Sequence, residues 1–201
     1  IVWDKRDKTL CLVRDRLGIK PLYWYQKKGC FAFASELKAL RKLPEFDDEI
    51  DENAFSEYLT VGYYRAPNTV YKNVKKLRQG HYCLTDLRGT LEENEFWSLY
   101  QVANKNSENK ISGSKVEAID DLEELCSDAV KLRMISDVPI GAFLSGGVDS
   151  SLVATLMQKS SAAPIKTFSI GFKDNNFDEA PYAKKIAAKI GSDHTELYVG
   201  P

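Results

Sequence analysis

The sequence has no excess of charge of either sign and no hydrophobic run long enough to cross a membrane. Its 28 Lys and Arg residues nearly balance 29 Asp and Glu residues, which gives a net charge of −1. Nucleic-acid surfaces and polybasic membrane patches both require clustered positive charge. A spanning helix needs about 20 consecutive apolar residues, and no stretch approaches that length. We therefore expect a soluble, cytoplasmic protein with no nucleic-acid or membrane partner.

Cysteine and histidine are scarce, and neither is spaced as in a metal site. The four cysteines lie far apart, at Cys11, Cys30, Cys83 and Cys126. They lack the C-x-x-C spacing of zinc and redox sites, so we expect buried, reduced thiols. The two histidines, His81 and His194, have no partner spacing for a metal or a catalytic triad. We assign neither a catalytic role.

Enough apolar sequence is present for one large core or two small ones. Hydrophobic residues make up 43% of the 201 residues and aromatic residues 11%, as in packed globular proteins. The segment ANKNSENKISGSK, residues 103–115, has no aromatic residue and one large apolar residue, which is typical of a linker. We predict a first domain over residues 1–102 and a second over residues 116–201.

The first domain shows strand and hairpin signals. Three short segments are rich in aromatic or branched residues and are separated by turn residues: Thr9–Asp15, Leu22–Gln26 and Cys30–Ser35. They predict an antiparallel meander. We then expect a short helix after Ser35, which we interpret as its cap, a second helix over about Asp51–Leu59, and one more strand after Gly80.

The second domain alternates helices and strands. Apolar residues recur at three- and four-residue steps from Val116 to Val130, which predicts a helix over residues 117–134. After it the pattern predicts strands over 140–144, 166–172 and 195–199, with helices over 150–159 and 179–190. This order indicates a parallel sheet with right-handed crossovers, covered by helices on both faces. The overall fold class is α/β.

The corner LSGGVDSS, residues 144–151, is the most informative stretch. It joins a buried strand to an amphipathic helix, at the strand ends where parallel sheets bind ligands. Two adjacent glycines permit positive φ angles and leave room for a ligand. Their N–H groups, with those of the first helical turn, can bind an anion. Ser145, Ser150 and Ser151 can donate to phosphate oxygens, and Asp149 can hold Mg²⁺.

Three well-known glycine motifs are absent from the sequence: G-x-x-x-x-G-K-[ST], G-x-G-x-x-G and G-x-S-x-G. Their absence argues against a P-loop lysine, a dinucleotide fingerprint and an acyl-transfer serine. An ordinary capped helix start remains an alternative. We favour a phosphate site.

LSGGVDSS resembles the pyrophosphate loop of ATP pyrophosphatases, and residues 168–199 resemble the next strand and helix of glutamine-hydrolysing asparagine synthetases. Several motifs of the first half are similar to the end of that family's glutaminase part, in the same order: RDRLGIKPLYWY, FASELKAL, GYYRAPNTVYKNVKKLRQGHY and the pair FW at Phe96 and Trp97. The resemblance covers essentially the whole chain.

The resemblance implies the remainder of an αββα N-terminal-nucleophile glutaminase domain, followed by the start of a doubly wound, Rossmann-like ATP pyrophosphatase domain. In that family glutamine supplies ammonia, and ATP with Mg²⁺ adenylates a carboxylate such as aspartate, giving the amide, AMP and pyrophosphate. A homodimer is included among the expected partners. The nucleotide-binding positions carried over are Leu144, Ser145, Gly146, Gly147, Asp149, Ser150 and Ile170, with Asp149 also as the metal ligand.

The family's glutaminase nucleophile is an N-terminal cysteine, and this sequence begins at Ile1. We therefore interpret the chain as a fragment that holds no catalytic residue and is inactive by itself. Two rival readings stay open: a relative that amidates another carboxylate or closes a lactam, and a non-catalytic nucleotide-binding scaffold. Arg14, Asp15 and Glu36 are candidates for coupling the domains, although exposed salt bridging is the simpler interpretation. Asp174, Asp178 and Glu179 follow the second strand and are weaker candidates for bordering the nucleotide.

Overall fold

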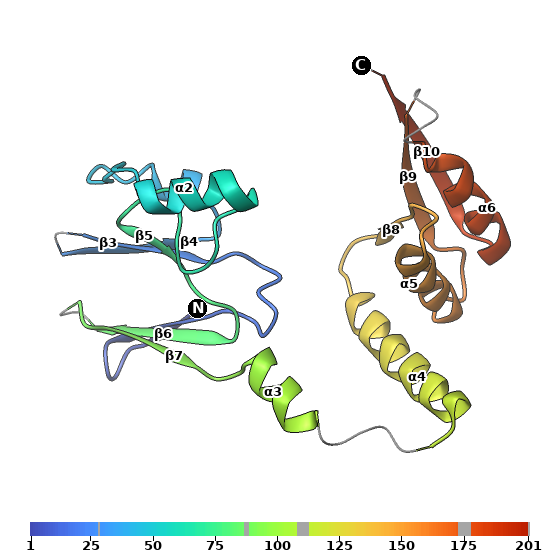
Figure 1. Cartoon of the computed structure of the whole chain (residues 1–201), viewed down its shortest axis with the longest axis horizontal. Helices are drawn as coiled ribbons and strands as arrows, with labels where there is room; N and C mark the ends of the chain where they lie inside the picture. Colours follow the sequence, from blue (N-terminus) through green and yellow to red (C-terminus); the bar gives the residue numbers. More distant parts are fainter. Residues whose placement is uncertain (28, 87–88, 108–112, 173–177, 201) are drawn as a thin grey trace. The chain divides into compact units, whose positions relative to one another are not determined.

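The chain divides into two units, residues 1–110 and 111–201, each with its own core (Figure 1). The computed structural model describes residues 1–27, 29–86, 89–107, 113–172 and 178–200. Both units mix helices with sheets, so the α/β class is confirmed. Within the described residues, no helix is long and apolar enough to cross a membrane.

Two antiparallel sheets form the first unit. One has the strand order β1-β2-β6-β7, with bounds Val2–Asp4, Thr9–Val13, His81–Asp86 and Leu91–Glu95. The other has the order β4-β3-β5, with bounds Cys30–Ala34, Tyr23–Lys27 and Val74–Lys76. Alternation along each strand sends side chains to opposite faces of its sheet.

That alternation builds two cores. Trp24 packs against a buried cluster drawn from both sheets, whose members are Leu12, Leu22, Leu77 and Cys83. Its neighbours Tyr23 and Tyr25 point to the other face, where Tyr25 packs with Leu40 and Val74. Leu40 belongs to the short helix α1 (Leu37–Leu40), and α2 (Glu52–Val61) lies over the same sheet (Figure 1).

The predicted meander is wrong, because its first strand belongs to the other sheet. Strand β2 pairs with β1 and β6, whereas β3 pairs with β4 and β5. Arg14 holds the connection between the sheets: its guanidinium donates to the carbonyl oxygens of Gly18 at 2.8 Å, Lys20 at 3.0 Å and Leu77 at 2.7 Å. The expectation that Arg14 forms exposed salt bridges is therefore also wrong.

The predicted start of the first helix in this unit is wrong, and that of the second is correct to within one residue. Ser35 is not a cap: α1 begins after Glu36, which makes no side-chain capping hydrogen bond, and the helix lasts only four residues. Asp51 does cap α2, because its carboxylate accepts from the Ala54 N–H at 3.0 Å. The second predicted helix is therefore confirmed, with bounds two residues later at its end.

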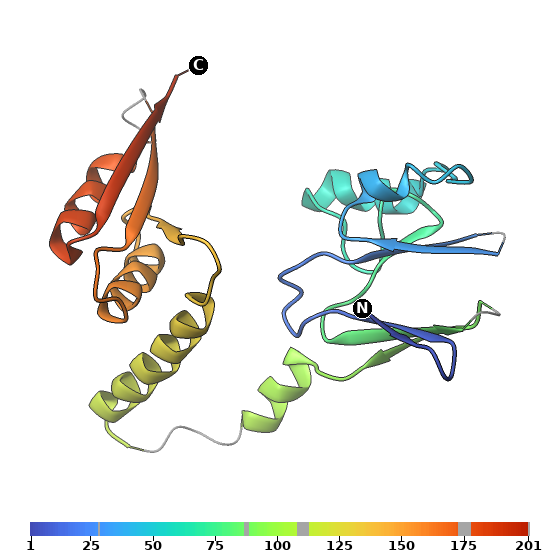
Figure 2. The ribbon, with the colours of Figure 1, turned by 180° about the vertical axis from the view of Figure 1, so that it is seen from behind.

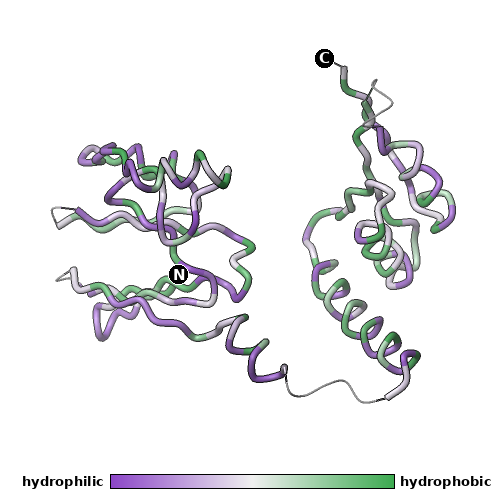
Figure 3. Tube along the Cα trace, in the orientation of Figure 1, coloured by the Kyte–Doolittle hydropathy of each residue, from purple (hydrophilic) through white to green (hydrophobic). Residues whose placement is uncertain are grey.

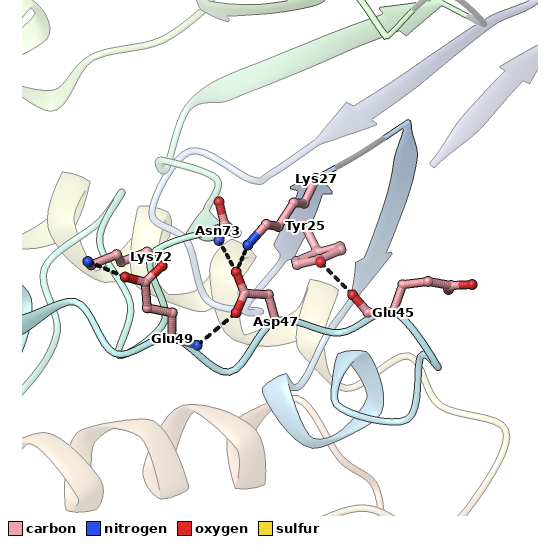
Figure 4. A network of polar contacts seen from close by, with 7 residues as sticks. All are labelled: Tyr25, Lys27, Glu45, Asp47, Glu49, Lys72 and Asn73. Atoms are coloured by element: carbon pink, nitrogen blue, oxygen red, sulfur yellow. Dashed lines mark hydrogen bonds and ion pairs between the residues drawn. The ribbon is translucent and has the colours of Figure 1, made fainter.

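Polar contacts tie the segment 45–49 to the second sheet (Figure 4). The Asp47 carboxylate pairs with Lys27 and accepts from Asn73 Nδ2 at 2.8 Å and from the Glu49 N–H at 3.2 Å. The buried Tyr25 hydroxyl donates to the Glu45 carbonyl at 2.8 Å. This segment is thereby fixed over the face that Tyr25 covers.

The four cysteines are free thiols, as expected. Only Cys83 is fully buried, and the other three are half-buried. Burial raises the pKa of the Cys83 thiol to about 11, so this thiol stays protonated at neutral pH.

Helix α3 (Leu99–Asn106) follows β7. It occupies residues 103–106 of the predicted linker, so that part of the linker is helical rather than irregular. Residues 108–112 of the predicted linker lie outside the described part of the chain. The composition of this segment indicated that it contributes no core residues, and α3 indeed has no buried side chain.

A three-stranded parallel sheet forms the second unit. Its order is β10-β9-β8, with bounds Asp193–Val199, Lys166–Phe172 and Gly141–Phe143. Helices α5 (Val148–Lys159) and α6 (Ala180–Ile190) connect the strands, and α4 (Lys115–Arg133) precedes them and packs on α5. The predicted order of helices and parallel strands is confirmed.

The prediction that helices cover both faces of this sheet is wrong for the described residues. One cluster buries residues of α4, α5 and α6 against the sheet, among them Val130, Ala154 and Ala183. Figure 2 shows the ribbon of these helices beside the strands. Strand β9 alternates buried and exposed residues along its length, and its outer face leaves Phe168, Ile170 and Phe172 between 38% and 48% exposed. Two successive crossovers of the same hand place both connecting helices on one face.

Candidate functional site

The corner between β8 and α5 is held at the carboxyl end of the sheet. The Leu144 N–H donates to the Phe168 carbonyl at 2.8 Å, which extends the β8 ladder by one residue. The Leu144 side chain is 1% exposed and belongs to the core of the unit. The chain then leaves the sheet at Ser145 and enters α5 at Val148, two residues earlier than predicted.

The two glycines have different conformations. Gly146 has a φ of +84°, whereas Gly147 has a φ of −71° and is the N-cap of α5. Of the two glycines, only Gly146 uses the positive φ that the sequence permits. A Cβ on Gly146 would lie 2.8 Å from the Ala183 nitrogen and 2.7 Å from the Tyr182 Cβ. A Cβ on Gly147 would meet only the Ser145 hydroxyl, at 3.4 Å.

The serines of the corner bind one another and the loop backbone. The Ser145 and Ser150 hydroxyls are hydrogen-bonded at 2.9 Å. The Ser145 N–H donates to the Ser150 hydroxyl, and the Gly147 N–H donates to the Ser145 hydroxyl, each at 3.3 Å. These contacts fix the curvature of the loop before any ligand binds. The Ser151 hydroxyl is buried and has no partner among the described residues.

Unpaired donors and one carboxylate surround the open side of the corner. Within the described residues, no acceptor takes the N–H groups of Gly146, Val148, Asp149 and Ser150. The Asp149 side chain is exposed in the first turn of α5 and makes no ion pair with a described residue. Free N–H groups at a helix start attract anions, since they carry the positive end of the helix dipole.

The donor set fits a magnesium ion that arrives with a nucleotide. Mg²⁺ takes oxygen ligands and is commonly held by one or two carboxylates together with substrate phosphates. Asp149 supplies one such carboxylate beside the unpaired N–H groups. The described residues contain no group of three acidic, His or Cys side chains able to hold a metal by themselves.

Leu144 and Ile170 lie on opposite faces of the sheet. Leu144 points into the helix-covered core, while Ile170 is 48% exposed on the outer face. The structure brings Ser145, Gly146, Gly147, Asp149 and Ser150 together in one loop, but Leu144 and Ile170 do not line one side of it. A nucleotide role for these two residues stays a prediction.

Asp178 has a structural role. Its carboxylate accepts from the Phe172 N–H at 3.3 Å and from the Ala180 N–H at 3.1 Å, which joins the end of β9 to the start of α6. Glu179 is the residue before α6 and makes no side-chain cap. Asp174 lies outside the described residues.

Sequence reasoning missed the residues that support the loop from behind. Tyr182 and Ala183, in the first turns of α6, leave no room for a side chain on Gly146. Ala183 is fully buried. The only signal in the sequence was the glycine itself, since its partner lies 37 residues further along the chain and no spacing rule connects them.

His194 lies in a buried polar cluster beside α6. Its Nδ1 is 2.9 Å from the Thr167 hydroxyl, and its Nε2 is 3.2 Å from the Ser169 hydroxyl. Both hydroxyl residues are buried under the helices, so the cluster is not open to a substrate. This placement agrees with giving His194 no catalytic role.

Two family models match separate parts of the chain. A glutamine amidotransferase domain model matches residues 1–97, and an asparagine synthase model matches residues 121–201. A putative glutamine-hydrolysing asparagine synthetase 2 of Methanocaldococcus jannaschii is 35% identical, over 98% of this chain and 38% of the relative. The glutamine-hydrolysing asparagine synthetase 3 of Bacillus subtilis is 32% identical, over 98% of this chain and 33% of the relative.

A relative with a different name also matches. The amidase chyE of Penicillium rubens is 29% identical, over 96% of this chain and 30% of the relative. The chain therefore spans between 30% and 38% of the length of these three relatives.

Proposed function

We propose that this chain, which is similar over 98% of its length to a putative glutamine-hydrolysing asparagine synthetase, acts within a longer enzyme of that kind. The enzyme uses glutamine as the ammonia source and ATP to activate the carboxylate of aspartate. It forms asparagine, AMP and pyrophosphate. The order of the two family matches, amidotransferase first and synthase second, supports this assignment.

The corner at residues 144–151 is the observation that carries the proposal. Its unpaired N–H groups offer hydrogen bonds to phosphate oxygens, and the Ser145 and Ser150 hydroxyls lie next to them. Hydrogen bonds from N–H groups to an anionic oxygen are stronger than those between neutral groups. Donors fixed before the reaction stabilise charge that develops on the departing pyrophosphate. In this proposal Ser145, Gly146, Gly147, Asp149 and Ser150 bind the phosphates.

Asp149 is the proposed ligand for Mg²⁺. A bound magnesium ion would neutralise charge on the phosphate oxygens. The carboxylate stands at the rim of the loop, exposed and without an ion pair to any described residue, so it needs no rearrangement to reach an incoming metal. Leu144 and Ile170 remain proposed nucleotide neighbours, on the family resemblance alone.

We assign the two units to two different domains of the proposed enzyme. We assign residues 1–102 to the end of an αββα glutaminase domain, because two sheets face each other there and helices cover one outer face. Residues 116–201 would begin a doubly wound ATP pyrophosphatase domain, with residues 103–115 as the connection. The glutaminase nucleophile is not proposed among the residues of this chain. A homodimer stays a prediction.

A second candidate function is amidation of a different carboxylate. The similarity to a protein named amidase supports it, and such an enzyme would use the same phosphate loop. A non-catalytic scaffold is the least supported reading, because the loop retains its open glycine, its hydroxyls and its carboxylate.

Exchange of labelled pyrophosphate into ATP tests this function in the full-length protein. We expect aspartate to stimulate exchange, and Asp149→Ala to reduce it at least about tenfold through the loss of one metal ligand. Asp120→Ala is the matched control, since Asp120 is an exposed carboxylate on α4. Exchange stimulated by another carboxylate and not by aspartate would favour the second function. Exchange unaffected by Asp149→Ala would remove Asp149 from the metal site.

A further inference from the structure

A small cavity lies in the first unit, far along the chain from the phosphate loop. Its volume is about 310 Å³, and it opens beside strands β3 and β5. The residues that line it include four tyrosines and one lysine: Tyr23, Leu37, Tyr58, Tyr63, Tyr64 and Lys76. Such a combination places aromatic faces, hydroxyl groups and a positive charge around one small space.

Lys76 is the charged group of this cavity, and it is half-buried. It pairs across the sheet with Tyr23, and its Nζ lies 5.6 Å from the centre of the Tyr23 ring. The same Nζ donates to the Tyr64 carbonyl at 3.3 Å. Burial, and to a smaller extent the nearby charge of Arg14, lower the pKa of Lys76.

Lys76, like the adjacent Lys75, has no counter-ion among the described residues, and of the two only Lys76 lines the cavity. No carboxylate in that part of the chain forms an ion pair with it, whereas Lys27 pairs with Asp47 and Lys72 pairs with Glu49 in the same unit. Removing a cation from water without a counter-ion costs free energy. A carboxylate entering the cavity would supply the missing partner.

Aromatic rings gather next to this charge. The Tyr58 ring stacks on Tyr64 with the centres 4.9 Å apart and the planes at 13°, and it also stacks on Phe55, at 6.5 Å and 18°. Tyr63 is 57% exposed, and Tyr58 is 38% exposed, so these rings face solvent where a ligand can reach them. Exposed aromatic rings favour planar apolar groups through offset or edge-to-face contacts.

We propose that this cavity binds a small carboxylate with a planar, apolar body. The carboxylate pairs with the Lys76 ammonium group, and the planar body lies against the exposed tyrosine rings. Both features fit one molecule, because the charge and the rings belong to the same cavity. The site is independent of the proposed synthetase function, since all of its residues lie in the first unit.

Benzoate is the probe that tests the site. In the 201-residue chain, the side-chain NMR signals of Lys76 and of the lining tyrosines should shift on addition of benzoate and saturate, with a Kd of about 1 mM, as for a small weakly held ligand. The pKa of Lys76, followed by the same signals, should rise in the presence of benzoate because the carboxylate stabilises the ammonium form. Benzyl alcohol, which is planar but neutral, should bind at least about tenfold more weakly.

Lys75 provides the matched control variant. It is the neighbour of Lys76 on β5 and pairs with Trp24, which belongs to the opposite face of the sheet. Lys76→Met should abolish the benzoate shifts, and Lys75→Met should leave them intact. Equal binding of benzoate and benzyl alcohol, a Lys76 pKa that benzoate does not raise, or unchanged binding in Lys76→Met would each overturn the proposal. The pKa measurement needs no variant, so it stands even if Lys76→Met fails to fold.

Discussion

Replacing Gly80 by alanine should unfold the first unit under conditions where the parent chain is folded. Gly80 has a φ of +66°, and an added Cβ would lie 2.1 Å from the Trp97 carbonyl oxygen. The Gly80 carbonyl in turn accepts from the N–H groups of Phe96 and Trp97, at 2.9 and 3.1 Å. A methyl group therefore forces apart two segments that are already hydrogen-bonded. We expect a loss of about 3 kcal/mol, from the strained φ and the displaced backbone together.

Tryptophan fluorescence measures this loss in the first unit alone, because all three tryptophans of the chain lie there: Trp3, Trp24 and Trp97. Thermal unfolding of Gly80→Ala should occur about 15 °C below the parent. Gly62→Ala is the matched control, since Gly62 has a φ of +81° and no atom within 4 Å of the added Cβ. It should cost only about 1 kcal/mol. Equal destabilisation by the two variants would show that the φ angle matters and the contact with Trp97 does not.

The second large effect is a difference in stability between alanine variants of the two glycines of the corner. Gly146→Ala should destabilise the second unit by about 3 kcal/mol, since the methyl group meets the backbone of α6 at a positive φ. Gly147→Ala should cost less than about 1 kcal/mol, because the φ of −71° suits alanine and the space is open. Its methyl group would instead occupy the open side of the loop and weaken phosphate binding.

Unfolding of the second unit can be followed by its amide NMR signals while tryptophan fluorescence reports that the first unit is intact. Gly146→Ala should lose the native signals of α5 and α6 at a lower temperature than the parent. Gly147→Ala should keep those signals and bind pyrophosphate at least about tenfold more weakly. If Gly147→Ala binds pyrophosphate like the parent, the phosphate does not lie over this side of the loop.

Local pattern was sufficient for the helices and the parallel strands. The apolar recurrence from Val116 to Val130 predicted α4 within two residues at its start, and the predicted start of α2 at about Asp51 lies one residue before the observed one. Hydrogen bonding within a helix, and the alternation of a strand, depend on neighbours in sequence. For that reason a single sequence can indicate them.

Partners distant in sequence were the source of the errors. Nothing in the segment 9–15 shows that β2 pairs with β6, about 70 residues later, rather than with β3. The turn residues predicted a hairpin between β2 and β3. Instead, β2 and β3 belong to different sheets, and hydrogen bonds from Arg14 to backbone carbonyls hold the connection between them. The outer face of the β10-β9-β8 sheet was likewise assumed to be covered. Figure 3 shows hydrophobic residues along these strands and along α4, and many of them are exposed in the described residues.

The sequence indicated the residues of the candidate site, but not the residues of α6 that hold the loop from behind. The sequence indicated the strand-to-helix corner, the hydroxyl groups and Asp149. It did not distinguish Gly146, which α6 holds from behind, from Gly147, which faces open space. It also placed Leu144 and Ile170 on one site, although they lie on opposite faces of the sheet.

Titration of the isotope-labelled 201-residue chain with inorganic pyrophosphate and Mg²⁺ tests the central claim most directly. The amide signals of Gly146, Val148, Asp149 and Ser150 should shift together and saturate, because their N–H groups have no acceptor within the described residues. The N–H groups at the start of α4 are the internal control, since the Ser114 hydroxyl and the Glu117 carboxylate already cap that helix. Shifts confined to the corner would support a pyrophosphate site. No saturable shift there, or equal shifts at the start of α4, would contradict it.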